Sequence, residues 1–110
     1  MTVQHKELAE GRWAKMPFLE QMANIGSEVE RALNWRIKNN PAYSRQAFER
    51  ALELTDLTLK SSRNKSRLKE VSRVREALVD YFTGDNIFLS SDLLWKKYFL
   101  SFAYAARRKT

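Results

Sequence analysis

The chain has 110 residues, with 20 Lys or Arg against 13 Asp or Glu and a formal net charge of +7, so it forms at most one basic domain. It has no cysteine, which excludes disulfides, thiolate zinc sites, iron–sulfur clusters and cysteine nucleophiles. Since His5 is the only histidine, multi-histidine metal sites are excluded as well, and we expect no catalytic residue, metal or cofactor.

Residues 1–16 are expected to form an arm ahead of the main domain. Gly11 loosens this segment, whereas Trp13 and Met16 are predicted to fold it back onto the end of the domain. No apolar run of the kind found in signal peptides follows the first residues, and no stretch approaches the ~20 apolar residues that span a bilayer. The expected location is therefore the cytoplasm, with no membrane partner.

The first of four predicted helices begins at Pro17, a residue type favoured in the first helical turn, and ends at the break Asn39-Asn40-Pro41. Gly26 on this helix would let a neighbouring helix come close. One apolar stripe at helical spacing comprises Phe18, Met22, Ile25, Val29 and Leu33.

The second helix is predicted after Pro41, and the third from about Ser66 to a stop at Gly84, which suits the left-handed position after a helix. The fourth follows Ser90-Ser91-Asp92, where either serine can cap the helix. No segment shows the alternation typical of strands. We therefore predict an all-α fold, an up-down-up-down four-helix bundle over residues 17–110 with the arm at 1–16.

Basic residues concentrate in two segments that this topology brings to one pole, the second loop and the C-terminus. Lys and Arg at the start of the third helix oppose its dipole, so an anion such as phosphate would stabilise this pole. Tyr104 offers a ring for base stacking beside Lys97 and Arg108. The predicted nucleic-acid-binding residues are Lys60, Arg63, Lys65, Arg67, Lys69, Lys97, Tyr104, Arg107, Arg108 and Lys109.

The aromatic residues of the fourth helix form an arc wider than one bundle core requires, which favours an interface between subunits. The predicted interface residues are Trp35, Trp95, Phe99 and Phe102. Arg75 lies beside the apolar side of the third helix and needs a carboxylate there. Glu28, Glu53 or Asp56 is the expected partner in a buried ion pair, and a phosphate-gripping role for Arg75 is the alternative.

The segment Val71-Ser-Arg-Val-Arg-Glu-Ala-Leu-Val-Asp-Tyr81-Phe82 resembles the helix that carries the Arg-x4–6-His motif of HEPN ribonucleases. Arg73 or Arg75 matches the motif arginine, but Asp80 or Tyr81 stands where the histidine would be. In length, helix number and charge, the chain is also similar to the small basic four-helix-bundle family of rRNA intervening-sequence proteins and diversity-generating-retroelement accessory proteins. That resemblance implies homo-oligomers that bind RNA or DNA without catalysis.

The first functional hypothesis is therefore a non-enzymatic, oligomeric helical-bundle protein that binds nucleic acid, RNA first, through its basic pole with weak sequence specificity. One alternative is a protein-interaction subunit that docks a larger or acidic protein through the aromatic fourth helix. A second alternative is a degenerate HEPN-like ribonuclease.

Overall fold

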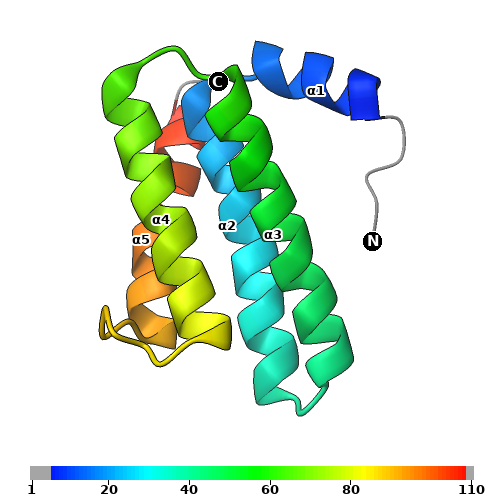
Figure 1. Cartoon of the computed structure of the whole chain (residues 1–110), viewed down its shortest axis with the longest axis vertical. Helices are drawn as coiled ribbons and strands as arrows, with labels where there is room; N and C mark the ends of the chain where they lie inside the picture. The colour runs from blue at the N-terminus through cyan, green and yellow to red at the C-terminus, as the bar shows by residue number, and fades with distance from the viewer. Residues whose placement is uncertain (1–5, 109–110) are drawn as a thin grey trace.

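The computed structural model describes the backbone of residues 6–108 and the side chains of residues 11–108. This part of the chain contains five α-helices and no strand, which confirms the all-α class. The helices are α1 (Lys6–Lys15), α2 (Phe18–Ile37), α3 (Pro41–Ser61), α4 (Lys65–Thr83) and α5 (Asp92–Arg108). From α2 to α5, successive helices run in alternating directions, so the α3–α4 loop lies at the same end of the molecule as the end of α5 (Figure 1).

Side-chain caps fix the starts of three helices. Asn40 accepts a hydrogen bond from the Tyr43 amide at 3.0 Å, and Asn64 accepts one from the Arg67 amide at 3.1 Å. At α5, Ser91 Oγ accepts from the Leu94 amide at 3.1 Å. These contacts satisfy amide groups that have no partner within the first helical turn.

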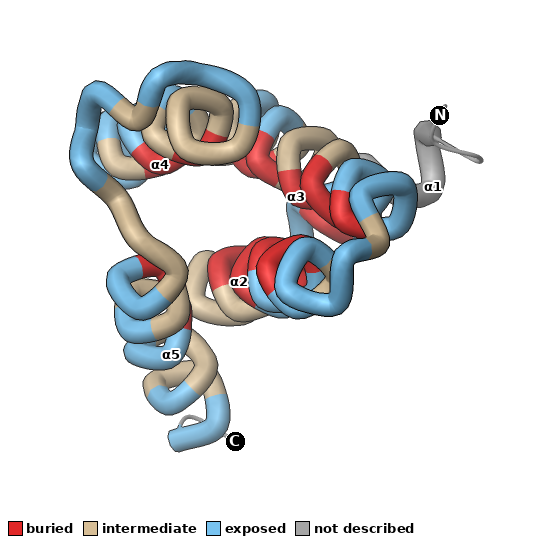
Figure 2. The backbone as a smooth tube through the Cα atoms, turned by 90° about the horizontal axis from the view of Figure 1, so that it is seen from below, coloured by how far each residue is buried: buried red, intermediate tan, exposed pale blue. Residues whose placement is uncertain are grey.

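The predicted stripe of α2 is confirmed as the centre of the core. Met22, Ile25 and Leu33 have no exposed surface, and Val29 is 1% exposed. α2 lies between α3 and α5 and packs closely on both (Figure 2). This central position explains why one face of α2 is apolar along most of its length.

The close approach expected at Gly26 is also confirmed. A Cβ atom placed on Gly26 would lie 2.6 Å from Cβ of Phe99 and 2.8 Å from Cγ of its ring. Since real side chains do not approach that closely, α5 can pack at this distance from α2 only because position 26 has no side chain.

Residues 6–15 of the predicted arm form a helix rather than a loose segment, and residues 1–5 lie outside the described residues. α1 packs against α3, where Trp13 is 7% exposed and its indole N–H donates to Thr58 Oγ1 at 2.8 Å. Gln21 Nε2 donates to the Trp13 carbonyl at 2.7 Å, which links α1 to α2. Trp13 thus folds the segment back onto the domain as expected.

The left-handed conformation predicted for Gly84 is wrong, because its φ is −109°. Asn86 and Leu89 take positive φ in the following loop instead.

Packing around the helices is uneven. α4 packs on α3 and α5 packs on α2, but the backbones of α4 and α5 do not pack closely against each other. Seen along the helices, α4 and α5 stand apart and are joined by the loop of residues 84–91 (Figure 2). The side of the molecule between α4 and α5 is therefore open, which positions the groove described next.

Candidate nucleic-acid interface

A groove of about 860 Å³ runs between α4 and α5. Its walls are mostly apolar and consist of Val74, Ala77, Leu94, Trp95 and Tyr98. Its rim is polar or charged and consists of Ser66, Lys69, Glu70, Arg73, Ser90 and Lys97. The walls and the rim together are called the α4–α5 groove. Its volume is in the range of ordinary ligand-binding clefts.

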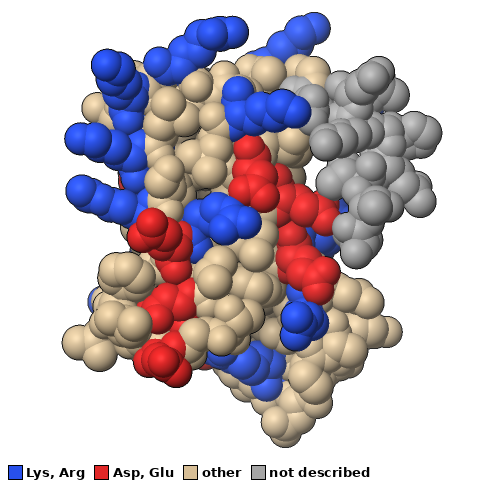
Figure 3. Space-filling view, in the orientation of Figure 1, with Lys and Arg blue, Asp and Glu red and all other residues tan. Residues whose placement is uncertain are grey.

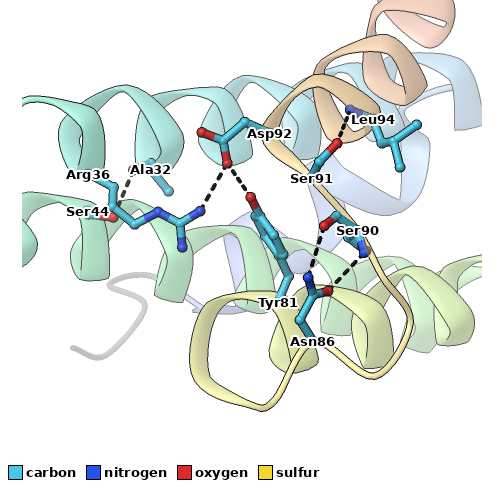
Figure 4. Close-up of polar contacts among 9 residues, drawn as sticks. All are labelled: Ala32, Arg36, Ser44, Tyr81, Asn86, Ser90, Ser91, Asp92 and Leu94. Carbon is cyan, nitrogen blue, oxygen red and sulfur yellow. Dashed lines mark hydrogen bonds and ion pairs between the residues drawn. The ribbon is translucent and has the colours of Figure 1, made fainter.

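The loop-side end of the groove is held by Asp92 in the first turn of α5. One carboxylate oxygen of Asp92 accepts from Arg36 Nη2 of α2 at 3.0 Å and from the Tyr81 hydroxyl of α4 (Figure 4). Burial and the hydrogen bond to Asp92 raise the pKa of the Tyr81 hydroxyl above its ordinary value. This network fixes where α5 begins relative to α2 and α4.

Halfway along the groove, a second tyrosine connects the two walls. The Tyr98 hydroxyl donates to Glu70 Oε2 at 2.7 Å. Burial, and then the hydrogen bond and the charge of Glu70, strongly raise the pKa of the Tyr98 hydroxyl. The Tyr98 hydroxyl therefore stays protonated at neutral pH and remains a donor. Beside this pair, the indole N–H of Trp95 is buried and has no acceptor among the described residues.

Basic side chains line both walls of the groove. Lys65, Lys69 and Arg73 follow one another at intervals of four residues on α4, which places them on one face of the helix. Lys97 lies on the opposite wall, on α5. Figure 3 shows Lys and Arg gathered over the first half of α4 and the adjacent end of the molecule, with Asp and Glu over the other half of α4 and along α3.

These cations differ from the arginines of α2 and α3 in the pairing of their charges. We call Arg63, Lys65, Lys69, Arg73 and Lys97 the basic face, and none of the five makes an ion pair within residues 11–108. The other basic residues of this range without an ion pair are Arg12, Lys15, Lys38, Arg67, Lys96 and Arg108. The arginines of α2 and α3 and Arg75 have carboxylate partners. Their pairs are Arg31–Glu28, Arg50–Glu28, Arg36–Asp92, Arg45–Glu49 and Arg75–Asp56.

The other predicted binding residues occupy varied positions. Arg67 is exposed, but its guanidinium lies 4.8 Å from the centre of the Phe18 ring. Arg108 lies 5.7 Å from the centre of the exposed Tyr104 ring and covers one side of it. Lys60 and Arg107 are exposed near the same end, each with a contact of its own, and Lys109 lies outside the described residues.

The predicted subunit interface needs a correction. Trp95 and Phe99 are 7% and 5% exposed because they belong to the core of this chain, stacked on each other. Phe102 is partly buried against the core, and Trp35 packs edge-on against Tyr43. The apolar residues that do reach the surface of this region are on other faces: Ile87, Phe88, Leu89, Leu93, Leu94 and Leu100.

Arg75 pairs with Asp56 and not with Glu28 or Glu53. Its Nε atom lies 2.7 Å from Asp56 Oδ1, and both side chains are partly exposed to solvent. Glu28 is buried, with Arg31 at 3.0 Å and Arg50 at 3.6 Å. Arg75 pairs with Asp56 because Arg75 lies on the side of α4 that faces α3, where Asp56 is exposed and within reach.

The positions at which a HEPN histidine would stand have structural contacts. The Asp80 carboxylate accepts from the Ile87 and Phe88 amides at 2.8 and 3.0 Å, and the Tyr81 hydroxyl is bonded to Asp92. Asp80 therefore holds the α4–α5 loop, and Tyr81 is bonded to the first turn of α5.

Comparison of the chain with known protein families, with curated proteins and with solved structures finds no match. No helix within the described residues has the length and apolar character needed to cross a membrane.

Of the residues that line the groove, only Lys69 and Lys97 were among the predicted binding residues. Arg73 could have been found from the four-residue interval that it shares with Lys65 and Lys69. Glu70 gave no signal, because its role depends on how far α5 stands from α4.

Proposed function

We propose that this protein binds nucleic acid through the basic face, as a non-enzymatic helical protein that contacts the phosphate backbone. The observation that carries the proposal is the gathering of unpaired charge: the five cations of the basic face have no carboxylate partner, whereas the arginines of α2 and α3 do. The proposal treats α2 to α5 as an up-down-up-down bundle that is open along the α4–α5 groove, and RNA as the first ligand to test.

Unpaired like charges are unfavourable to the free protein. Each pair of like charges four residues apart on a helix costs about 0.2–0.5 kcal/mol, and α4 has two such pairs in Lys65–Lys69 and Lys69–Arg73. The first turn of α4 has no acidic residue to offset the positive end of the helix dipole. A bound polyanion would relieve both costs, since phosphates neutralise the lysines and the amide end of the helix together.

The test is the salt dependence of binding to a labelled 20-nucleotide RNA, measured by fluorescence anisotropy. If all five cations of the basic face contact phosphates on a single strand, the slope of log K against log salt is about −3.5, at about −0.7 per contact. Binding that is absent at low salt, or that hardly changes with salt, would overturn the proposal.

A matched pair of triple variants locates the site. Lys65→Gln, Lys69→Gln and Arg73→Gln together remove three charges from the basic face, and we expect the slope to fall to about −1.4 with weaker binding to every sequence. The control removes the same charge elsewhere, in Arg31→Gln, Lys38→Gln and Arg45→Gln. If both triple variants bind equally well, the basic face is not the site.

A protein partner is the second candidate, and a different surface favours it. In the α4–α5 loop, the apolar tip, defined as Ile87, Phe88 and Leu89, is 77%, 58% and 80% exposed. The Asp80 carboxylate holds two of its amides, so these side chains are displayed by an ordered loop. Exposed apolar clusters of this kind mark interaction sites. Two results would support this candidate: capture of one acidic protein partner, or self-association. Either must be lost in Phe88→Ser while nucleic-acid binding is unchanged.

A further inference from the structure

We infer that the α4–α5 groove accepts an unpaired nucleobase that carries an exocyclic amino group, so that the ligand of the basic face is a single strand. This inference rests on the proposed function and adds the chemical class of the ligand. It is carried by three features that meet in one place: the apolar walls, the unpaired cations on the rim and the Glu70 carboxylate between them.

The walls of the groove suit a flat, apolar ring. Val74 and Ala77 on α4 face Leu94, Trp95 and Tyr98 on α5 across the open side of the bundle. Leu94 is 55% exposed, so a ligand in the groove would bury apolar surface that the chain leaves in water. The bases of a duplex have their faces covered by stacking, whereas those of a single strand are free to enter such a slot.

The rim places positive charge on both sides of the slot. Lys69 and Arg73 stand on the α4 wall and Lys97 on the α5 wall, and none of the three makes an ion pair within the described part of the chain. Phosphates on either side of an inserted base would therefore meet cations from both helices. This arrangement matches a strand that crosses the groove with one base turned inward.

A carboxylate on the groove distinguishes a base from an apolar side chain of a protein partner. Glu70 accepts one hydrogen bond from the Tyr98 hydroxyl, which leaves the carboxylate able to accept more. A leucine or phenylalanine inserted beside Glu70 would cover the carboxylate without pairing it, which is costly. A heterocycle with an amino group supplies a donor for it.

The carboxylate decides which bases fit. The Glu70 carboxylate accepts from the Tyr98 hydroxyl and has further oxygen lone pairs with which to accept. An exocyclic amino group, as in cytosine, adenine and guanine, donates to such a group. Uracil has a carbonyl at the position of the cytosine amino group, and that carbonyl would be repelled by the carboxylate.

The experiment compares labelled 12-nucleotide oligo(C) and oligo(U) RNA, and a duplex of the same length, by anisotropy at fixed salt. We expect oligo(C) to bind about 10-fold more tightly than oligo(U), the ratio that one hydrogen bond to a charged acceptor supplies. Oligo(C) should also bind at least about 10-fold more tightly than the duplex. In Glu70→Gln, which can still accept from Tyr98 but also presents N–H groups, the ratio should fall to near 1 or invert. Glu76→Gln on the exposed side of α4 has the same charge change and should keep the ratio.

A second pair of variants tests the groove without changing charge. Ala77→Phe fills the slot, and we expect it to weaken oligo(C) binding about 10-fold; Ser72→Phe adds the same ring at an exposed position of α4 and should have no effect. Circular dichroism shows whether each variant folds. Equal binding of oligo(C), oligo(U) and duplex, or no effect of Ala77→Phe in a folded protein, overturns this inference and leaves the proposed function standing. No binding to any of the three at low salt overturns both.

Discussion

Replacing Gly26 by alanine tests the packing of α2 on α5 directly. Alanine would place its Cβ 2.6 Å from Cβ and 2.9 Å from Cδ1 of Phe99, well inside van der Waals contact. The nearest atom is Cβ of Phe99, which rotation of the Phe99 side chain does not move. α5 must therefore shift away from α2, and overpacking of this kind costs about 1–3 kcal/mol.

A second effect acts in the opposite direction. Alanine favours the helix over glycine by about 1 kcal/mol at an unobstructed helical site. Because the clash is with Cβ of Phe99, we expect the overpacking cost at the upper end of that range, about 2–3 kcal/mol. The net expectation for Gly26→Ala is then a loss of about 1–2 kcal/mol, and each kcal/mol lowers the melting temperature by about 4–8 °C in a domain of this size. Urea unfolding followed by circular dichroism measures the loss as a lower midpoint, with the slope unchanged.

Gly11→Ala is the control, because nothing lies within 4 Å of a Cβ at Gly11 and α1 can take the alanine without strain. We expect Gly11→Ala to leave stability unchanged or to raise it. In a Phe99→Ala background the clash is gone, so the further change Gly26→Ala should become neutral or stabilising. If Gly26→Ala is as stable as the original protein, α5 does not approach α2 as closely as described, and the reasoning fails.

Three further changes have defined outcomes. The pKa of Tyr98 is raised in the folded protein, so the stability that the protonated hydroxyl contributes is complete below the ordinary tyrosine pKa of about 10 and is lost as the pH rises above it. Urea unfolding between pH 9 and about 11 should therefore show that the free energy of unfolding falls less steeply with pH in Tyr98→Phe than in the original protein. Equal slopes in the two proteins would contradict this. Asp80→Ala frees the Ile87 and Phe88 amides, so hydrogen exchange at these amides should accelerate and unfolding should cost about 1–3 kcal/mol less; unchanged protection would show that the carboxylate does not hold the loop. Trp13→Phe removes the hydrogen bond to Thr58 and should lower the free energy of unfolding in urea by about 1–2 kcal/mol. The same change in a Thr58→Val background should cost less. Equal costs in the two backgrounds would mean that the hydrogen bond contributes nothing to stability.

Much of the helical structure could be predicted from local patterns. The stripe from Met22 to Leu33 and the break at Pro41 are visible in the sequence because helix periodicity and proline geometry act over a few residues. The close approach at Gly26 could be predicted for the same reason, since a glycine on an apolar face leaves space for a neighbour.

The open side between α4 and α5 could not be predicted in this way. Whether α5 packs evenly between its neighbours or mainly on α2 depends on contacts such as Gly26 with Phe99 and Asp92 with Arg36, which join distant segments. For the same reason Trp95 and Phe99 were expected at a subunit interface, although they fill the core of their own chain. The pairing of Arg75 with Asp56 was among the alternatives, but only the arrangement of α3 and α4 decides between the carboxylates.

The uneven packing also has a consequence for the order of folding. α2 and α3 are neighbours in sequence and pack closely, whereas α5 reaches α2 only after two intervening helices have been placed. Closing that long loop costs more chain entropy, so the α2–α3 hairpin is expected to form early and α5 to join it last. The last helix to dock is also one wall of the groove, so the first opening of the native protein would separate that wall from the rest of the fold.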